Sequence, residues 1–454
     1  MIRPQRLPTP FAINPQLARS FRTTIPLAMK RIIVCCDGTS KDDNANSADD
    51  TSAPSNIVLL SRAISMVSYT AIPQIVYYQP GVGTADAGLL SRLAQSALGK
   101  SLGYKVRSAY TFIVHNYEPG DEIFLFGFSR GGFTARSVAG FIEWAGVLRK
   151  TQMYMKDFDK LWEAYKKKEN VPDEKDRFDA LKGLEYRDRY TNVYIKCVGV
   201  FDTVAALGIP SFAPIDDDFD KLARSAAEAQ SFYDVDLGEH VDYAFQALAL
   251  DEHRRDFYPA IWKVIKPQHY QVRDNDGKAD QVVYQTWFAG AHSDIGGGYP
   301  EDGLSGVSLA WMISKLVRHG LLDFDMKYLR EIFAENRPKE QWEFPPHDSA
   351  YGFSGFPRLR YVDRKPGAFP PAPLSPPPTH PDDHFTSIQT IHKSVLERVR
   401  KEEETGVSVG ERYLDTCTAL QKWGYGEAWI EENLEAPDTK SLPEGAGSAA
   451  RMLS

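Results

Sequence analysis

Cysteine is scarce in this chain and poorly placed for chemistry. The 454 residues include four cysteines, of which Cys35 and Cys36 are adjacent, and no two form a Cys-x-x-Cys pair. A zinc site built on thiolates is therefore not expected. Four cysteines in so long a chain predict a reducing compartment rather than a disulfide framework. We expect no metal and no cofactor.

Long apolar runs and an excess of basic residues are also missing. No stretch is apolar over the width of a bilayer, and no secretory apolar region opens the chain. The net charge of −8 argues against nucleic acid as a partner, because nucleic-acid binding needs a basic face. Hydrophobic residues make up 43% and charged residues 25%, as in globular enzymes. We therefore expect a cytoplasmic enzyme.

The first 30 residues have a composition of their own. No acidic residue precedes Asp37, and the basic residues up to the first predicted strand are Arg3, Arg6, Arg19, Arg22, Lys30 and Arg31. An Arg-rich segment without acids is typical of a mitochondrial transit peptide, so the mitochondrion is the alternative location. Prolines interrupt any helix in the first half, at positions 4, 8, 10 and 15. We interpret residues 1–30 as a basic arm.

Strand-like and helix-like segments alternate along most of the chain. Apolar, β-rich runs predict strands at 31–36, 74–78, 122–126, 192–201 and 282–288. Helical patterns predict helices at 56–66, 103–117 and 132–148. This alternation indicates an α/β fold, with a mostly parallel central sheet flanked by helices. We assign it to a catalytic domain over residues 31–322.

Other stretches depart from this alternation, and we interpret them as helical and loop insertions that cap the sheet. Residues 150–190 are charged and helical, and residues 209–260 hold an acidic loop followed by a helical pattern. Residues 323–435 form a C-terminal extension with a proline-rich segment at 366–381, a composition typical of polyproline linkers. Residues 436–454 are expected to be disordered.

The most informative motif is Gly127-Phe-Ser-Arg-Gly131, which follows a predicted strand and precedes a predicted helix. This context is what the nucleophile elbow of an α/β-hydrolase requires. Glycine on both sides of Ser129 permits the tight turn, and the dipole of the following helix favours negative charge at the serine. Ser129 is therefore the predicted nucleophile.

Two further residues are predicted to complete a catalytic triad. Asp202 directly follows the strand at 192–201, and His292 follows the strand at 282–288. The carboxyl ends of parallel strands meet at one edge of a sheet, where Ser129 is also expected. His292 would take the serine proton, and Asp202 would orient the imidazole. The alternatives are Asp251 and Asp294 for the acid, and His384 and His392 for the base.

Backbone N–H groups of Arg130 and Gly38 are the predicted oxyanion donors. Arg130 follows the nucleophile, and Gly38 lies after the first strand, where glycine lets N–H groups approach a substrate. The Arg130 side chain is predicted either to contact a substrate phosphate or to form a buried ion pair. Candidates for substrate binding are Asp37, Thr39, Phe128 and Asp294. Asp37 has a second interpretation, which is that it holds its own loop together.

Several segments are similar to those of one known family. They are Asp37-Gly-Thr39, Gly81-Val-Gly-Thr84, Gly127-Phe-Ser-Arg-Gly-Gly-Phe-Thr-Ala-Arg136, Phe201-Asp-Thr-Val204, Ala247-Leu-Ala-Leu-Asp-Glu-His-Arg254 and His292-Ser-Asp-Ile-Gly-Gly-Gly-Tyr299. Together they resemble the α/β-hydrolases that include the catalytic module of type VI secretion phospholipase effectors. The resemblance spans about residues 31–320.

This resemblance implies a Ser–Asp–His serine hydrolase that cleaves carboxylic esters through an acyl-enzyme. It also implies a phospholipid or another lipid ester as substrate, with transient contact to a membrane surface. Two alternatives stay open. One is an esterase or lactonase that acts on a small metabolite, and the other is a non-catalytic binding protein of the same fold.

Overall fold

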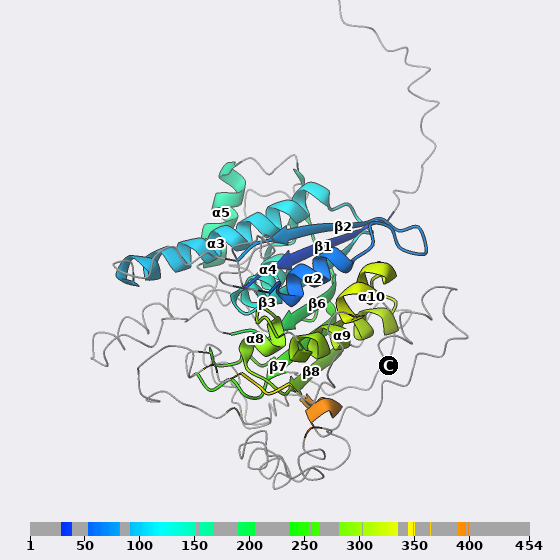
Figure 1. Ribbon diagram of the computed structural model, residues 1–454. Helices are drawn as coiled ribbons and strands as arrows, with labels where there is room; N and C mark the ends of the chain where they lie inside the picture. The colour runs from blue at the N-terminus through cyan, green and yellow to red at the C-terminus, as the bar shows by residue number, and fades with distance from the viewer. Residues whose placement is uncertain are drawn as a thin grey trace, which may run out of the picture.

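A computed structural model describes residues 29–38, 53–81, 91–150, 155–166, 189–204, 237–254, 257–262, 281–301, 303–334, 344–347, 349, 364, 389–395 and 398. Its centre is a seven-stranded sheet in the order β2-β1-β3-β6-β7-β8-β9, and every neighbouring pair is parallel (Figure 1). The predicted α/β fold is therefore confirmed.

The strands of this sheet are short and mostly buried. They are β1 (Arg31–Cys36), β2 (Gln74–Gln79), β3 (Glu122–Phe128), β6 (Ile195–Phe201), β7 (Val241–Ala249), β8 (Val282–Phe288) and β9 (Thr390–Ile391). A separate antiparallel ribbon pairs β4 (Val147–Leu148) with β5 (Arg189–Tyr190). Strands of a parallel sheet are covered on both faces, which explains the nearly continuous apolar sequence of β1 and β3.

Helices cover both faces of the sheet. They are α2 (Asn56–Ala63), α3 (Ser91–Asn116), α4 (Arg130–Ala145), α5 (Met155–Lys166), α8 (His292–Gly296), α9 (Gly303–Arg318) and α10 (Met326–Ala334). Within the described ranges, no helix is long and apolar enough to cross a bilayer.

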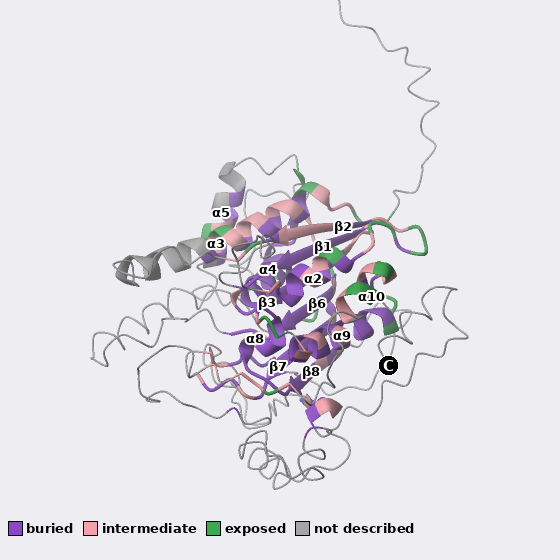
Figure 2. Cartoon of the chain, viewed as in Figure 1, coloured by how far each residue is buried: buried purple, intermediate pink, exposed green. Residues whose placement is uncertain are grey.

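Alternate residues of each strand enter two different cores, because side chains alternate between the faces of a sheet. Ile32 and Val34 of β1 pack with α3, α4 and α5, whereas Ile33 and Cys35 pack with α2, α9 and α10. The buried residues of both cores line the sheet along its length (Figure 2).

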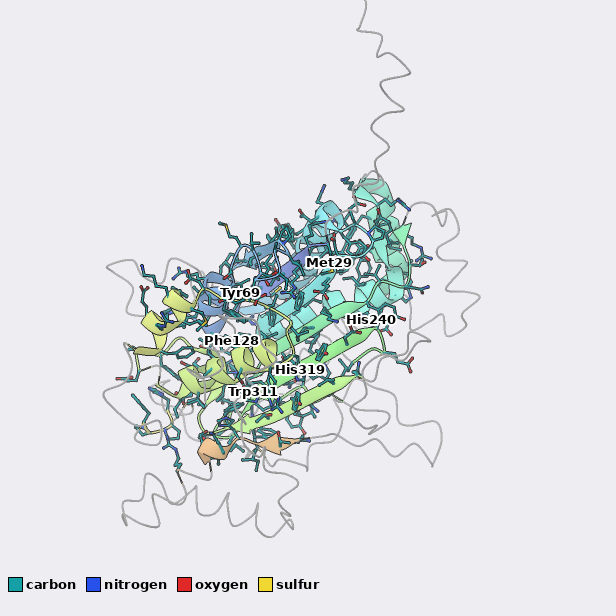
Figure 3. All side chains as sticks on the ribbon, turned by 90° about the vertical axis from the view of Figure 1, so that its right-hand side faces the viewer. Met29, Tyr69, Phe128, His240, Trp311 and His319 are labelled. Atoms are coloured by element: carbon teal, nitrogen blue, oxygen red, sulfur yellow. The ribbon has the colours of Figure 1, made fainter. Side chains whose placement is uncertain are left out.

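Aromatic side chains fill the core between α9 and the sheet. Trp311 of α9 and His319, which directly follows this helix, extend toward β7 and β8 (Figure 3). The Trp311 ring lies 5.4 Å from that of Phe288, and the His319 ring lies 5.1 Å from that of Tyr243. These contacts fix α9 on the half of the sheet that carries the His292 loop.

The expected helical insertion over residues 209–260 is wrong at 241–249, where the structure has β7 inside the sheet, between β6 and β8. The segment Val-Asp-Tyr-Ala-Phe-Gln-Ala-Leu-Ala contains several alanines and reads as a helix. Strand propensity depends strongly on context, and burial on both faces of the sheet overrides this local preference. The predicted helix at 103–117 also begins earlier, at Ser91.

The C-terminal extension takes part in the sheet. β9 pairs with β8, and Trp287 Nε1–H donates to Gln389 Oε1 at 2.8 Å. The His392 ring stacks at 4.6 Å on that of Phe288, and burial lowers the pKa of His392 to about 3. His392 is therefore a packed residue at the sheet edge. The predicted arm, the proline-rich segment and the tail lie outside the described residues, except for Met29 and Lys30.

Glycines allow a very close approach of backbone segments after β3. A Cβ on Gly131 would lie 2.1 Å from the Cys36 carbonyl oxygen, and one on Gly127 would lie 2.4 Å from the Gly131 oxygen. Any side chain there would force the first turn of α4 away from the ends of β1 and β3. By contrast, a Cβ on Gly306 of α9 would meet no heavy atom within 4 Å.

Two alanine substitutions should therefore have opposite effects. Gly131→Ala should lower the free energy of unfolding by about 1–3 kcal/mol through overpacking. Gly306→Ala should raise it by about 0.4–1 kcal/mol, because it reduces the entropy of the unfolded chain without a clash. Chemical denaturation of both variants measures the difference, and equal effects of the same sign would refute the proposed backbone contact.

Candidate active site

Ser129 occupies a strained turn between β3 and α4. Its backbone has φ 57° and ψ −124°, and its side chain makes no cap hydrogen bond to the helix. Its N–H donates to the Phe201 carbonyl at 3.0 Å. A positive φ is costly for a residue other than glycine and is found mostly where the surroundings enforce it, often at functional sites. The predicted strand–turn–helix is present, with its serine placed at the carboxyl edge of the sheet.

Asp202 and His292 meet at the same edge. Asp202 follows β6 with φ 33°, and His292 is the first residue of α8. Nδ1 of His292 lies 2.6 Å from Oδ2 of Asp202. Because an ionised carboxylate can only accept, Nδ1 carries the proton and Nε2 is left as the basic nitrogen.

Burial and charge oppose each other in this pair. Burial alone would raise the pKa of the fully buried Asp202, but Arg364 and His292 hold it well below its usual range. Burial lowers the pKa of His292, and Asp202 opposes that effect. The resting pair is therefore a carboxylate beside a neutral imidazole, the state required of a general base and its orienting acid.

Phe128 links the serine to the histidine. Its ring, directly before Ser129, lies 4.7 Å from the His292 ring, and it is labelled at the end of β3 in Figure 3. In the described part of the chain the Ser129 hydroxyl is not hydrogen-bonded to His292. Catalytic hydrogen bonds are often long in the absence of substrate. The structure thus places all three predicted residues at one edge and bonds two of them.

Glu252 is a further residue of this site, which the sequence did not indicate. It is 1% exposed, and its Oε2 accepts the backbone N–H of His292 at 3.3 Å. Although burial raises its pKa, Arg254 lowers it to about 2. Glu252 follows β7. Because the sequence of 241–249 predicts a helix, it does not predict that Glu252 lies at the carboxyl edge of the sheet.

Arg254 and Phe257 cover the other side of the imidazole. Phe257 lies edge-on to His292 at 4.8 Å, and the Arg254 guanidinium lies 3.5 Å from the centre of the Phe257 ring. Nε and Nη2 of Arg254 both donate to Glu252 at 2.8 Å. The Arg254 guanidinium is therefore held in one orientation, and the Phe257 ring lies between it and the His292 imidazole.

Arg364 is a further residue of the site that the sequence did not indicate. Its guanidinium donates to both oxygens of Asp202, at 2.6 Å and 3.2 Å, and its side chain is 3% exposed. It stands in the C-terminal extension, in a stretch with neither helical nor strand periodicity. No local pattern could have associated it with Asp202.

The predicted oxyanion donors lie beside Ser129. Arg130 begins α4, where its N–H has no acceptor within the helix. A Cβ on Gly38 would lie 3.4 Å from the Ser129 Cβ, but the Gly38 N–H donates to Asp37 Oδ1 at 2.6 Å. Gly38 can serve an oxyanion only if this bond is exchanged, and both roles stay predictions.

The Arg130 guanidinium differs from the other arginines of the site. Burial lowers its pKa. It forms no ion pair with a described residue. Contact with a substrate phosphate and the predicted pair with a buried acid therefore both stay predictions.

Asp37 acts in the structure as a loop-holding residue. Its carboxylate accepts the Ser55 hydroxyl at 2.6 Å and the Tyr78 hydroxyl at 2.8 Å, which connects the end of β1 to the N-cap of α2 and to β2. Thr39 lies outside the described residues. Phe128 is 2% exposed and packs on the imidazole, and its contact with substrate stays a prediction.

The alternative triad acids hold the turn before His292. Asp251 Oδ2 accepts the Gly290 N–H at 2.6 Å, and Asp294 Oδ2 accepts the Ala291 N–H at 2.9 Å. Asp294 also pairs with His347 at 2.6 Å. Within the described residues, Asp202 is the acid that contacts the His292 ring. The alternative base His384 lies outside those residues.

The fold and this edge define an α/β protein of the hydrolase type, and comparison with known proteins gives its family. The family model described as "T6SS, Phospholipase effector Tle1-like, catalytic domain" matches residues 30–315, well over half of the 454 residues. The chain belongs to this family. Membership supports a hydrolase of the phospholipase or esterase type.

Individual relatives are more distant. Uncharacterized protein YEL023C of Saccharomyces cerevisiae is 33% identical over 198 residues, which cover 40% of this chain and 27% of that protein. This chain thus spans about a quarter of that protein's length. The assignment to the family rests on the family match.

Two solved structures are similar at low TM-score. The Tle1 effector bound to the VgrG spike of the type 6 secretion system is 21% identical, with a TM-score of 0.32 over 60% of this chain and 51% of that one. An uncharacterized protein from Pseudomonas aeruginosa is 20% identical, with a TM-score of 0.35 over 63% and 45%.

The identity of the triad acid can be tested with two matched substitutions. Asp202→Asn should lower kcat for a p-nitrophenyl ester by about 10⁴-fold, because Nδ1 loses its acceptor and the tautomer is no longer enforced. Asp251→Asn should retain hydrolysis, because it removes a bond to the turn and none to the imidazole. Circular dichroism of both variants checks that they are folded. Activity lost in Asp251→Asn and kept in Asp202→Asn would reverse the assignment.

Proposed function

We propose that this chain is a serine hydrolase that cleaves carboxylic esters of lipids, phospholipids above all, through an acyl-enzyme. The single observation that carries the proposal is the buried bond of 2.6 Å between His292 Nδ1 and Asp202 Oδ2, at the sheet edge where the strained Ser129 stands. The family match over residues 30–315 supports the same reaction class.

In the proposed reaction, the Ser129 hydroxyl oxygen attacks the ester carbonyl carbon as its proton passes to His292 Nε2. The N–H groups of Arg130 and Gly38 bind the resulting oxyanion. The bond to the alcohol then breaks, and the alcohol leaves with the proton from His292. Water attacks the acyl-enzyme by the same route, releases the acid and restores Ser129.

The state of His292 sets the pH dependence of this reaction. His292 accepts a proton only when it is neutral, so the rate rises as pH increases through its pKa. Since burial lowers that pKa, the neutral base persists to a lower pH than the ordinary value of about 6.5 would allow.

Two cations favour a substrate that carries an anionic group. Arg254 is held over Phe257, beside His292, and its side chain is 30% exposed. Arg130 follows Ser129 and forms no ion pair among the described residues. A guanidinium recognises phosphate through several N–H donors in one plane, which a phospholipid would satisfy and a neutral metabolite would not. An esterase or lactonase for small metabolites is therefore the second candidate, and a non-catalytic binding protein is the third.

The nucleophile can be tested by covalent labelling. A fluorophosphonate probe should label the wild-type chain and fail to label Ser129→Ala, because the probe reacts with an activated serine. Ser137→Ala is the matched control on α4, the helix that follows Ser129, since the Ser137 hydroxyl is buried and donates to the Phe133 carbonyl of the same helix. It should be labelled like the wild type. A wild-type chain that takes no label would refute the enzyme hypothesis and leave the binding protein.

The substrate class can be tested at Arg254. Arg254→Met should lower kcat/KM for anionic or zwitterionic phospholipid vesicles by about tenfold or more, the loss expected for a hydrogen bond to a charged group. Hydrolysis of a neutral p-nitrophenyl ester should change far less. If both substrates were affected equally, Arg254 would act through Glu252 and His292 and not on the substrate. Arg254→Lys should recover part of the loss, because it restores the charge without the planar fork.

A further inference from the structure

Arg364 reaches the candidate catalytic centre from outside the family-matched residues 30–315. Nη1 donates to Asp202 Oδ1 at 2.6 Å, and Nη2 donates to Oδ2 at 3.2 Å. A guanidinium that bonds both oxygens of a carboxylate restricts its plane and its direction. The orientation of Asp202 toward His292 therefore depends on a residue of the C-terminal extension.

Backbone carbonyl groups hold the guanidinium in turn. Nη1 also donates to the Ala249 oxygen at 2.8 Å, and Nη2 donates to the Phe257 oxygen. The Ala249 N–H donates to Asp202 Oδ1 at 3.0 Å. Arg364, Asp202 and the end of β7 are thus connected in a closed set of hydrogen bonds. Among the described residues, removal of Arg364 would leave Oδ1 with the Ala249 N–H as its donor.

The charge of Arg364 affects His292 through the shared carboxylate. Asp202 Oδ2 accepts both from His292 and from Arg364. When His292 takes a proton, the imidazolium faces a carboxylate whose negative charge is already partly compensated by a cation behind it. An anion compensated in this way stabilises a neighbouring cation less than a free anion does.

We propose that Arg364 is a positioning residue, which holds the Asp202 carboxylate against His292 and weakens the negative charge that the imidazole faces. Its consequence for catalysis rests on the proposed function, whereas its effect on the basicity of His292 does not. Among the described residues, the other charged groups that affect the pKa of His292 are Glu252 and Arg254 after β7. Asp294, on the same helix α8 as His292, is paired with His347. Within the described residues, none of these is bonded to Asp202.

The basicity of His292 can be measured without any substrate. In the full chain with labelled histidine, NMR titration gives the pKa of each imidazole, and His292→Gln assigns the His292 signal. Arg364→Met should raise the pKa of His292 by about one unit or more, because an uncompensated carboxylate favours the imidazolium. An unchanged pKa in folded Arg364→Met would overturn the proposal.

Arg398→Met is the matched control. Arg398 is also a buried arginine of the C-terminal extension, 1% exposed, and it donates to the Phe344 carbonyl. This substitution should leave the pKa of His292 unchanged although it also removes a buried guanidinium. A shift equal to that of Arg364→Met would indicate a general effect of loosening the extension and would overturn the proposal.

Arg364→Lys separates charge from geometry and covers the case in which Arg364→Met does not fold. Lysine retains the charge but cannot bond both oxygens in one plane. The pKa of His292 should stay near that of the wild type, while the plateau rate of fluorophosphonate labelling falls by about 10- to 100-fold, the loss typical of a misplaced catalytic group. A plateau rate equal to that of the wild type would overturn the positioning role.

The two readouts also separate this proposal from the proposed function. If the wild-type chain took no fluorophosphonate label, the hydrolase proposal would fail, and the NMR titration would still decide the effect of Arg364 on His292. If labelling succeeded and the pKa of His292 did not respond to Arg364→Met, the hydrolase proposal would stand and this one would fail.

Discussion

The buried carboxylate of Asp202 is the group on which the arrangement of the site depends. It is 0% exposed, and an ionised group in such a place is tolerated only when hydrogen bonds and opposite charge replace the water it has lost. Its partners come from three separate parts of the chain: the end of β7, helix α8 and the C-terminal extension. The hydrogen bonds that compensate the charge of Asp202 thus hold these three parts of the chain together at the site.

A second constraint is the close approach of backbone segments below the serine. The first turn of α4 lies against the end of β1, with no room for a side chain at Gly131. This contact holds Ser129 at a positive φ, which costs about 1–3 kcal/mol in isolation. The packing of α4 into the core that it shares with α3 and α5 offsets that cost. The position of the serine is therefore a property of the helix–strand packing rather than of the pentapeptide alone.

The local sequence pattern predicts a strand correctly where the segment itself has a clear apolar run. The strands β1, β3 and β8 begin at their predicted residues, because buried parallel strands have apolar runs of a recognisable length. The rule that parallel strands end at one edge predicts Ser129, Asp202 and His292 at that edge. Pattern failed at β7, whose alanine-rich sequence favours a helix locally and forms a strand only between β6 and β8.

The failure at β7 had a further consequence for the site. Asp251 and Glu252 follow that strand, and a helix predicted over 241–249 does not bring Glu252 to the sheet edge beside His292. The role of Arg364 could not be predicted from the sequence for a different reason. Its partner Asp202 lies 162 positions earlier in the sequence, and an isolated arginine outside any periodic element gives no indication of where its guanidinium will lie.

The amino-acid order is enough to predict the class of fold, the tight turn at Ser129 and the residues that follow each strand. These depend on apolar periodicity, on glycine and on the direction of parallel strands, all of which are local properties. Three features follow from packing alone: which acid contacts the His292 ring, the bonds of Asp37 within its loop, and the place of Arg364 behind Asp202. These contacts join buried polar and charged side chains of segments that are distant in the sequence. Which side chains meet depends on how those segments pack in space, and sequence neighbours do not indicate it.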